Sequence, residues 1–126
     1  MRKDYAIDLG PDGSLRTDDG TALSPGPGWT PEHLLLAGLV RCSLESPRFH
    51  ATRAGVEVES ATASANAHVE KRESDGRFAI VDVGVAVDVR LVPLPDDPSE
   101  LLAKAERDCF VGASLTAKTH YRWTVN

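Results

Sequence analysis

Two long stretches in the second half of the chain alternate hydrophobic and polar residues with a period of two. The clearer stretch is residues 81–91, where a valine or leucine stands at every second position. In residues 56–69 the hydrophobic positions shift by one residue near Glu59 and Ser60, which predicts a β-bulge. A charged turn over residues 70–76 separates the two stretches. This pattern predicts two half-buried antiparallel strands.

The two ends of the chain predict shorter strands. Residues 3–17 carry alternating hydrophobic positions around a Gly-Pro-Asp-Gly turn, so they predict a hairpin. A loop rich in glycine and proline follows as far as Gly28. Residues 121–125 alternate again and predict a last strand.

A first helix is predicted after this loop, with Thr30 as its N-cap. Residues 34–40 are apolar on every side of the helix and not along one stripe. That pattern predicts a helix enclosed by other elements or by a second subunit. Pro47 cannot donate a hydrogen bond to the carbonyl of Ser43, so we expect the helix to kink or end there and to resume over residues 48–54.

A second helix is predicted to begin at Asp97, which suits an N-cap. Leu102, Ala105 and Cys109 recur at helical spacing, so Cys109 is expected on the buried side near the end of this helix. The resulting order of elements is β-β-α-β-β-α-β, without internal repeats. It predicts a single α+β domain over residues 1–126.

Charge and composition exclude several classes of function. The 126 residues include 14 Lys and Arg against 19 Asp and Glu, a net charge of −5 that argues against binding to nucleic acid. Nothing approaches ~18 consecutive apolar residues, so no membrane-spanning helix is predicted. The first residues lack the apolar segment of a secretory signal, and we therefore expect a cytoplasmic protein.

Cys42 and Cys109, the only cysteines, are the residues whose placement most needs an explanation. In a reducing compartment two cysteines are more typical of catalysis or redox chemistry than of a structural disulfide. Both could instead be small buried hydrophobic residues, as free cysteines commonly are. The first interpretation requires Cα atoms roughly 5.5 Å apart, which the sequence does not establish.

A cysteine attacks a peroxide as the thiolate, so a cation is expected to bring its pKa below ~8.5. Arg41 diverges from Cys42 by roughly 100° around a helix and is instead placed to pair with Glu45. The cation is therefore expected from elsewhere in the chain. Arg16 on the N-terminal hairpin is the candidate, although it could equally be a solvated turn residue.

No metal or other cofactor is expected. The four histidines and two cysteines show neither the C-x₂-C nor the H-x₃-H spacing of structural zinc sites, although His33, His50, His68 and His120 could be combined with the cysteines. A Ser/His/Asp hydrolase is not indicated either, because the chain contains no G-x-S-x-G turn.

Two segments resemble motifs of the osmotically inducible protein C / organic hydroperoxide resistance (OsmC/Ohr) family. Residues 30–42 resemble its P-E-x-L-L-x-A-x-x-x-C helix, and residues 105–111 resemble its A-E-x-x-C-x-V segment. The resemblance covers essentially the whole chain. It implies an OsmC-like α+β fold with antiparallel sheets around two central cysteine-bearing helices, in an intertwined homodimer.

The resemblance also implies a thiol peroxidase that reduces organic hydroperoxides. Cys42 would be oxidised to a sulfenic acid, Cys109 would resolve it as a Cys42–Cys109 disulfide, and a dithiol such as a lipoylated protein would restore the thiols. The family also uses an arginine that holds the thiolate, for which Arg16 is the candidate, and a glutamate that Glu32 matches. About 15 Å of helix rise separates Glu32 from Cys42, so Glu32 would act through an arginine or across a dimer interface.

Two alternatives remain open at this point. The first is a non-catalytic OsmC-like dimer that binds an apolar or electrophilic small molecule between its subunits. The second is a hot-dog thioesterase, because that fold also wraps a long helix in an antiparallel sheet. In a thioesterase neither cysteine would matter to the reaction.

Overall fold

A computed structural model describes residues 1–126, which divide into two compact units, residues 1–33 and 34–126. The smaller unit is a three-stranded antiparallel sheet in the order β1-β2-β3. Its first two strands confirm the predicted hairpin. The third lies in a segment expected to be a loop, because two residues are too few to show an alternation. The strands are β1 (Ile7–Leu9), β2 (Leu15–Thr17) and β3 (Ala22–Leu23).

The long helix α1 (Pro31–Arg53) begins where the sequence predicts. The hydroxyl of Thr30 accepts a hydrogen bond from the backbone N–H of His33 at 3.3 Å, as an N-cap does. The helix continues through Pro47 to Arg53, so the expectation that it could end there is wrong, whereas helical structure after Pro47 agrees with the expected resumption. A proline inside a helix costs ~3 kcal/mol, and here the burial of Pro47 and its neighbours, including Ser46 and Ala51, opposes that cost.

The main sheet has the order β4-β5-β6. The two predicted long strands pair antiparallel, and the predicted bulge is confirmed as a register shift between Val58 and Ser60. The last strand runs parallel to β5, so the sheet is mixed and not purely antiparallel. A parallel pair needs a long crossover connection, which the helices between these strands provide. The strands are β4 (Glu57–Lys71), β5 (Phe78–Val92) and β6 (His120–Val125).

The crossover contains two helices where the sequence predicts one, α2 (Ser99–Arg107) and the short α3 (Phe110–Ala113). The N-cap position of α2 is Pro98, one residue later than predicted, and the carboxylate of Asp97 accepts a hydrogen bond from the N–H of Ser99 at 3.0 Å. Cys109 lies after the C-cap of α2 and is itself the N-cap of α3. Only Cys42 therefore lies inside a helix, although the predicted burial of Cys109 is confirmed.

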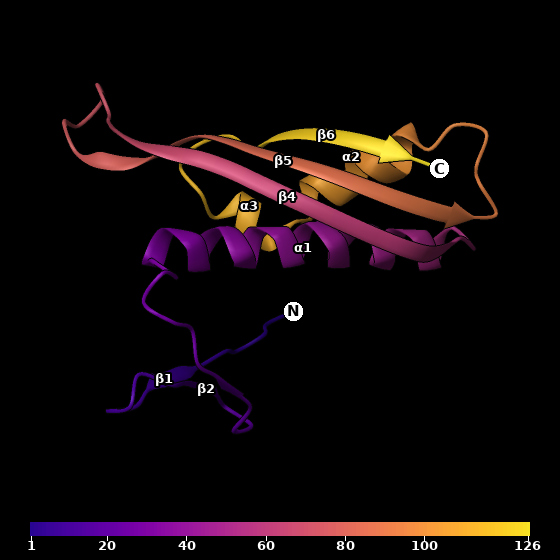
Figure 1. The fold of residues 1–126 in the computed structure, drawn as a ribbon. Helices are drawn as coiled ribbons and strands as arrows, with labels where there is room; N and C mark the ends of the chain where they lie inside the picture. The colour runs from indigo at the N-terminus through magenta and orange to yellow at the C-terminus, as the bar shows by residue number, and fades with distance from the viewer. The chain divides into compact units, whose positions relative to one another are not determined.

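The core of the larger unit lies between the sheet and the helices. Figure 1 shows α1 running along one face of the sheet. Leu39 of α1 and Leu101 of α2 pack into one buried cluster with the inward-facing side chains of β5. These side chains are the predicted alternating set, Val83, Val85, Val87, Val89 and Leu91. The observed class is α+β, as predicted.

The apolar run of α1 is only half buried in one chain. Leu34, Leu35 and Leu36 are partly exposed, whereas Leu39 is fully buried. The side chain of Phe49, further along the helix, is 57% exposed. Enclosure of this helix by a second subunit stays a prediction, as does the assignment of the whole chain to one domain. None of the helices has the length and apolar character needed to cross a membrane.

Candidate functional site

The two thiols contact each other although they come from distant segments. Cys42 lies in α1 and is partly exposed, Cys109 lies between α2 and α3 and is buried, and both are free cysteines. Their side chains hydrogen-bond to each other. The expectation that folding brings the two sulfur atoms together is confirmed, while their chemical roles stay predictions.

Backbone amides at the start of α3 point at both sulfur atoms. The N–H groups of Phe110 and Val111 donate hydrogen bonds to the sulfur of Cys42. The N–H of Gly112 donates to the sulfur of Cys109 at 3.4 Å. Donors directed at a sulfur stabilise its thiolate over its thiol. The first turn of α3 therefore contacts both sulfur atoms, and its Phe110 and Val111 amides favour the thiolate of Cys42.

Burial acts in the opposite direction on the reactive candidate. It is the largest influence on Cys42 and raises the pKa of its thiol, and the Cys109 side chain raises it further against the effect of the amides. None of the groups with the main influence on this pKa is a cation. Because the thiolate is the nucleophile, an efficient reaction at Cys42 requires a positive charge in addition to these neighbours.

Tyr121 is a residue of the site that sequence reasoning missed. Its hydroxyl lies 3.5 Å from the hydroxyl of Ser43 and hydrogen-bonds to Cys109, and its ring stacks on that of Trp123. Burial raises the pKa of this phenol far above its ordinary value, so Tyr121 remains a neutral O–H donor beside the thiols. The alternation of residues 121–125 predicted a strand but not which groups Tyr121 contacts.

A second set of contacts ties α1 to the segment before Cys109. The hydroxyl of Ser46 donates to the backbone oxygen of Ala105 at 2.7 Å. One turn further along α1, Nε2 of His50 lies 2.8 Å from a carboxylate oxygen of Asp108, and the side chain of His50 is only 9% exposed. Cys42, Ser46 and His50 recur every four residues, so one face of α1 carries the thiol and both of these contacts. This four-residue spacing is the sequence signal that could have identified Ser46 and His50.

Asp108 is expected to stabilise the fold only above strongly acidic pH. The hydrogen bond from Arg107 is the largest cause, and His50 a smaller one, that lowers the pKa of Asp108 from 3.8 to about 2. A carboxyl with a depressed folded-state pKa stabilises above its unfolded value and loses that contribution as pH falls through the folded value. Asp108→Asn should therefore lower the melting temperature at pH 7, and the deficit should shrink as the pH falls from 4 towards 2.

Thermal melts of both proteins across this pH range measure the effect. Asp96→Asn, at an exposed position just before α2, is the matched control and should follow the parent at every pH. A deficit in Asp108→Asn that is as large at pH 2 as at pH 7 would contradict the assignment.

The other two predicted site residues belong to the smaller unit. Arg16 is exposed in β2, and Glu32 is exposed in the first turn of α1. Both belong to the unit of residues 1–33, whereas both cysteines belong to the other unit. Their roles as thiolate-binding arginine and orienting glutamate stay predictions.

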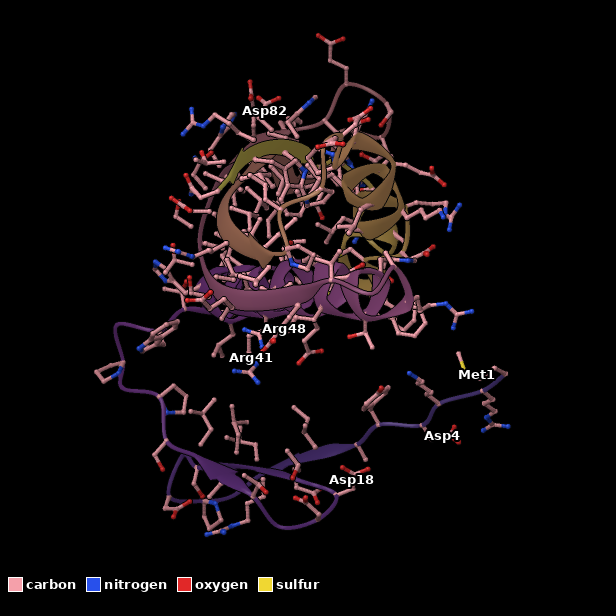
Figure 2. The ribbon with its side chains drawn as sticks, turned by 90° about the vertical axis from the view of Figure 1, so that its right-hand side faces the viewer. Met1, Asp4, Asp18, Arg41, Arg48 and Asp82 are labelled. Atoms are coloured by element: carbon pink, nitrogen blue, oxygen red, sulfur yellow. The ribbon has the colours of Figure 1, made fainter.

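Arg41 behaves as the helix geometry predicts. A guanidinium nitrogen of Arg41 lies 4.0 Å from a carboxylate oxygen of Glu45, and both side chains are well exposed. Figure 2 shows Arg41 and Arg48 projecting from α1 on the side turned away from the sheet. Neither is among the main influences on the pKa of Cys42.

Comparisons with known proteins agree with this fold. An OsmC-like protein from Mycoplasma pneumoniae has 18% sequence identity and a TM-score of 0.75, covering 99% of each chain. An OsmC-like protein of unknown function from Vibrio cholerae has 15% identity and a TM-score of 0.77, covering 97% of this chain and 99% of that one. An organic hydroperoxide resistance protein from Elizabethkingia anophelis has 19% identity and a TM-score of 0.66, covering 100% of each.

At these identities the solved structures establish a shared fold. No curated protein matches the chain. The family itself is established by its sequence model, which is described as OsmC-like protein and matches residues 24–124. The chain therefore belongs to the family of OsmC-like proteins.

Proposed function

We propose that this OsmC-like chain is a thiol peroxidase that reduces organic hydroperoxides. The observation that carries the proposal is the contact between the Cys42 and Cys109 thiols beneath the amide donors of α3. The family match supports it, and so does the similarity in fold to an organic hydroperoxide resistance protein. The family match also removes the hot-dog thioesterase as an alternative.

The proposed reaction balances with the groups present and one external reductant. The Cys42 thiolate attacks the outer oxygen of the hydroperoxide, the O–O bond breaks, and the organic fragment leaves as an alcohol after taking up a proton. Tyr121 is a neutral donor beside the thiols that can hydrogen-bond the departing oxygen. Cys109 then attacks the Cys42 sulfenic acid, releasing water and forming the disulfide. A dithiol, such as a lipoylated protein, returns two electrons and two protons.

The proposal also includes a cation, a second subunit and a reducing compartment, in addition to the thiol pair. Arg16, oriented by Glu32, would supply the positive charge that Cys42 lacks among its neighbours, from its own chain or from a second copy. A homodimer would also cover the half-exposed leucines of α1. The reaction needs a compartment where thiols stay reduced, such as the cytoplasm.

The raised pKa of Cys42 favours one alternative, a dimer that binds a small molecule without turning it over. A thiol that stays protonated at neutral pH reacts slowly with peroxides. The two functions differ in what one equivalent of hydroperoxide does to the protein.

Intact mass and peptide mapping after one equivalent of cumene hydroperoxide test the proposed function. The peroxidase should lose two hydrogen atoms per chain, contain a Cys42–Cys109 disulfide and release one equivalent of alcohol. A dithiol should then restore the original mass. Two unmodified thiols after this treatment would refute the peroxidase and leave the binding function.

A further inference from the structure

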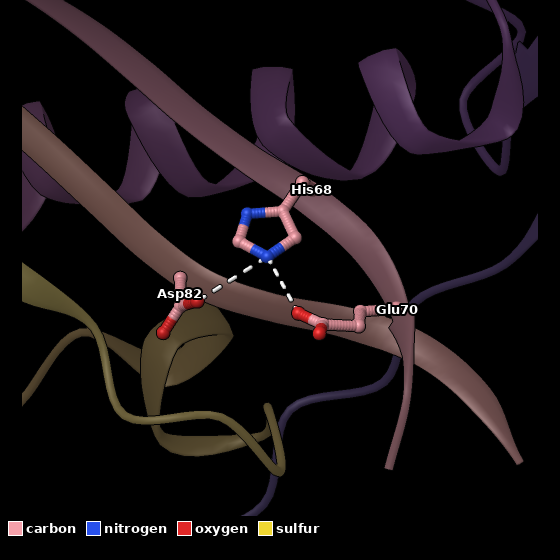
Figure 3. Close-up of side chains that lie close together, drawn as sticks. All are labelled: His68, Glu70 and Asp82. Atoms are coloured by element: carbon pink, nitrogen blue, oxygen red, sulfur yellow. Dashed lines mark hydrogen bonds and ion pairs between the residues drawn. The ribbon is translucent and has the colours of Figure 1, made fainter.

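A histidine and two carboxylates meet on the outer face of the main sheet, away from the thiol pair. His68 and Glu70 come from β4, and Asp82 comes from β5 (Figure 3). Nε2 of His68 lies 3.0 Å from a carboxylate oxygen of Glu70 and 3.3 Å from one of Asp82. One donor atom from each residue lies within 4.8 Å of the other two. The three side chains thus converge on one point.

The pairing of β4 with β5 places the three side chains on one face, next to an irregularity in the sheet. Asn66 pairs with Gly84 but His68 pairs with Val81, so one residue of β4 faces two residues of β5. Asp82 is one of those two and has φ +50°, the left-handed conformation that aspartate tolerates better than most residues. Continued in the register of Asn66 and Gly84, the two strands would place Asp82 directly opposite His68 on the same face. The irregularity moves Asp82 one position away from the direct partner of His68, and its carboxylate still lies within ion-pair distance of Nε2 on the outer face.

We propose that His68, Glu70 and Asp82 bind a divalent transition-metal ion of the Zn²⁺ class. Imidazole nitrogen and carboxylate oxygen bind zinc at about 2.0–2.2 Å, which sets adjacent ligand atoms about 3.0 Å apart in octahedral and 3.4 Å apart in tetrahedral geometry. The separations of 3.0 and 3.3 Å from His68 match this spacing. Binding an ion between these groups therefore requires only small side-chain movements.

Charge and ligand type narrow the choice of ion. The two carboxylates balance the charge of a divalent cation. The imidazole favours Zn²⁺ and its neighbours in the transition series over Mg²⁺ and Ca²⁺, which take oxygen ligands. The side chains of His68, Glu70 and Asp82 are 54%, 64% and 73% exposed, so water can fill the remaining coordination positions.

The metal site is separate from the thiol pair. Figure 2 shows Asp82 on the side of the larger unit opposite Arg41, with the sheet between Asp82 and α1. A bound ion would link β4 to β5 near the turn that joins them, and would raise the stability of the folded chain. A chain that does not bind zinc would therefore not argue against the peroxidase, and a chain without peroxidase activity would not argue against the metal site.

Zinc titration of the metal-free chain tests the proposal, with isothermal calorimetry as the readout. Both cysteines are replaced by serine in every protein used, because thiolates are themselves strong zinc ligands. We expect one equivalent of Zn²⁺ per chain. His68→Gln removes the imidazole, and Asp82→Asn removes a charge while keeping a residue that tolerates positive φ. Each should weaken binding at least about tenfold.

His120→Gln, at an exposed histidine of β6 outside the cluster, is the matched control and should bind zinc like the parent. Zinc should also raise the melting temperature of the parent and of this control but not that of Asp82→Asn. Circular dichroism establishes that each variant is folded. Absence of binding to the parent, or unchanged affinity in His68→Gln and Asp82→Asn, would overturn the site.

Discussion

Replacing Cys42 with serine is expected to reduce the turnover of cumene hydroperoxide by at least about a thousandfold. A serine hydroxyl fits the space of the thiol and can accept the same hydrogen bonds from Phe110 and Val111. It is nevertheless a far weaker nucleophile and cannot hold the oxygen as a sulfenic acid. A steady-state assay with a dithiol reductant measures the loss. Full turnover in Cys42→Ser would contradict the proposed function.

Cys109→Ser should fail at a different step. It keeps the attacking thiol, so one equivalent of alcohol should appear in a rapid first phase. The reaction should then stop, because nothing in the chain resolves the Cys42 sulfenic acid, and a dimedone-type reagent should label Cys42. Thr52→Ala is the matched control, since its hydroxyl contacts only the backbone of Arg48 on the same helix. It should turn over hydroperoxide at the parent rate.

The parts of the fold that depend on local pattern could be predicted from the sequence. The alternation of residues 81–91 identified β5, and the one-residue slip near Ser60 identified a bulge. The direction and pairing of strands depend on contacts between distant residues, so the parallel pairing of β6 with β5 could not be predicted from the sequence. Pro47 shows the same limit, because burial around it overrides the local tendency of proline to end a helix.

The candidate site, like the fold, could be predicted from the sequence only in part. The two cysteines could be identified as candidates from their residue type, but the contact between them depends on how α1 packs against the junction of α2 and α3. Tyr121 lay in a predicted strand, and only the folded chain shows the thiols beside it. Asp82 occupied a polar position of an alternating strand, and its closeness to His68 depends on the register between β4 and β5, which the hydrophobic pattern of a single strand does not give.

The positive charge that Cys42 lacks leads to the second large effect, which is expected in Arg16→Ala. Burial raises the pKa of the Cys42 thiol, and the amides of α3 do not offset it. A cation at ~4 Å in a partly buried site contributes about 4 kcal/mol, or about three pKa units in favour of the thiolate. Allowing for solvent screening, its loss should slow the reaction at pH 7 by about a hundredfold.

The pH profile distinguishes this role from a structural one. If Arg16 lowers the thiol pKa, the parent rate is nearly flat above neutral pH because the thiolate is already formed. In Arg16→Ala the rate should rise about tenfold per pH unit until the higher pKa is reached, so its deficit should shrink in alkaline solution. Arg41→Ala, which loses only an exposed pair with Glu45, should keep the parent profile. A deficit in Arg16→Ala that is constant across pH would assign the cation to another residue, because a merely structural loss does not change the ionisation of Cys42.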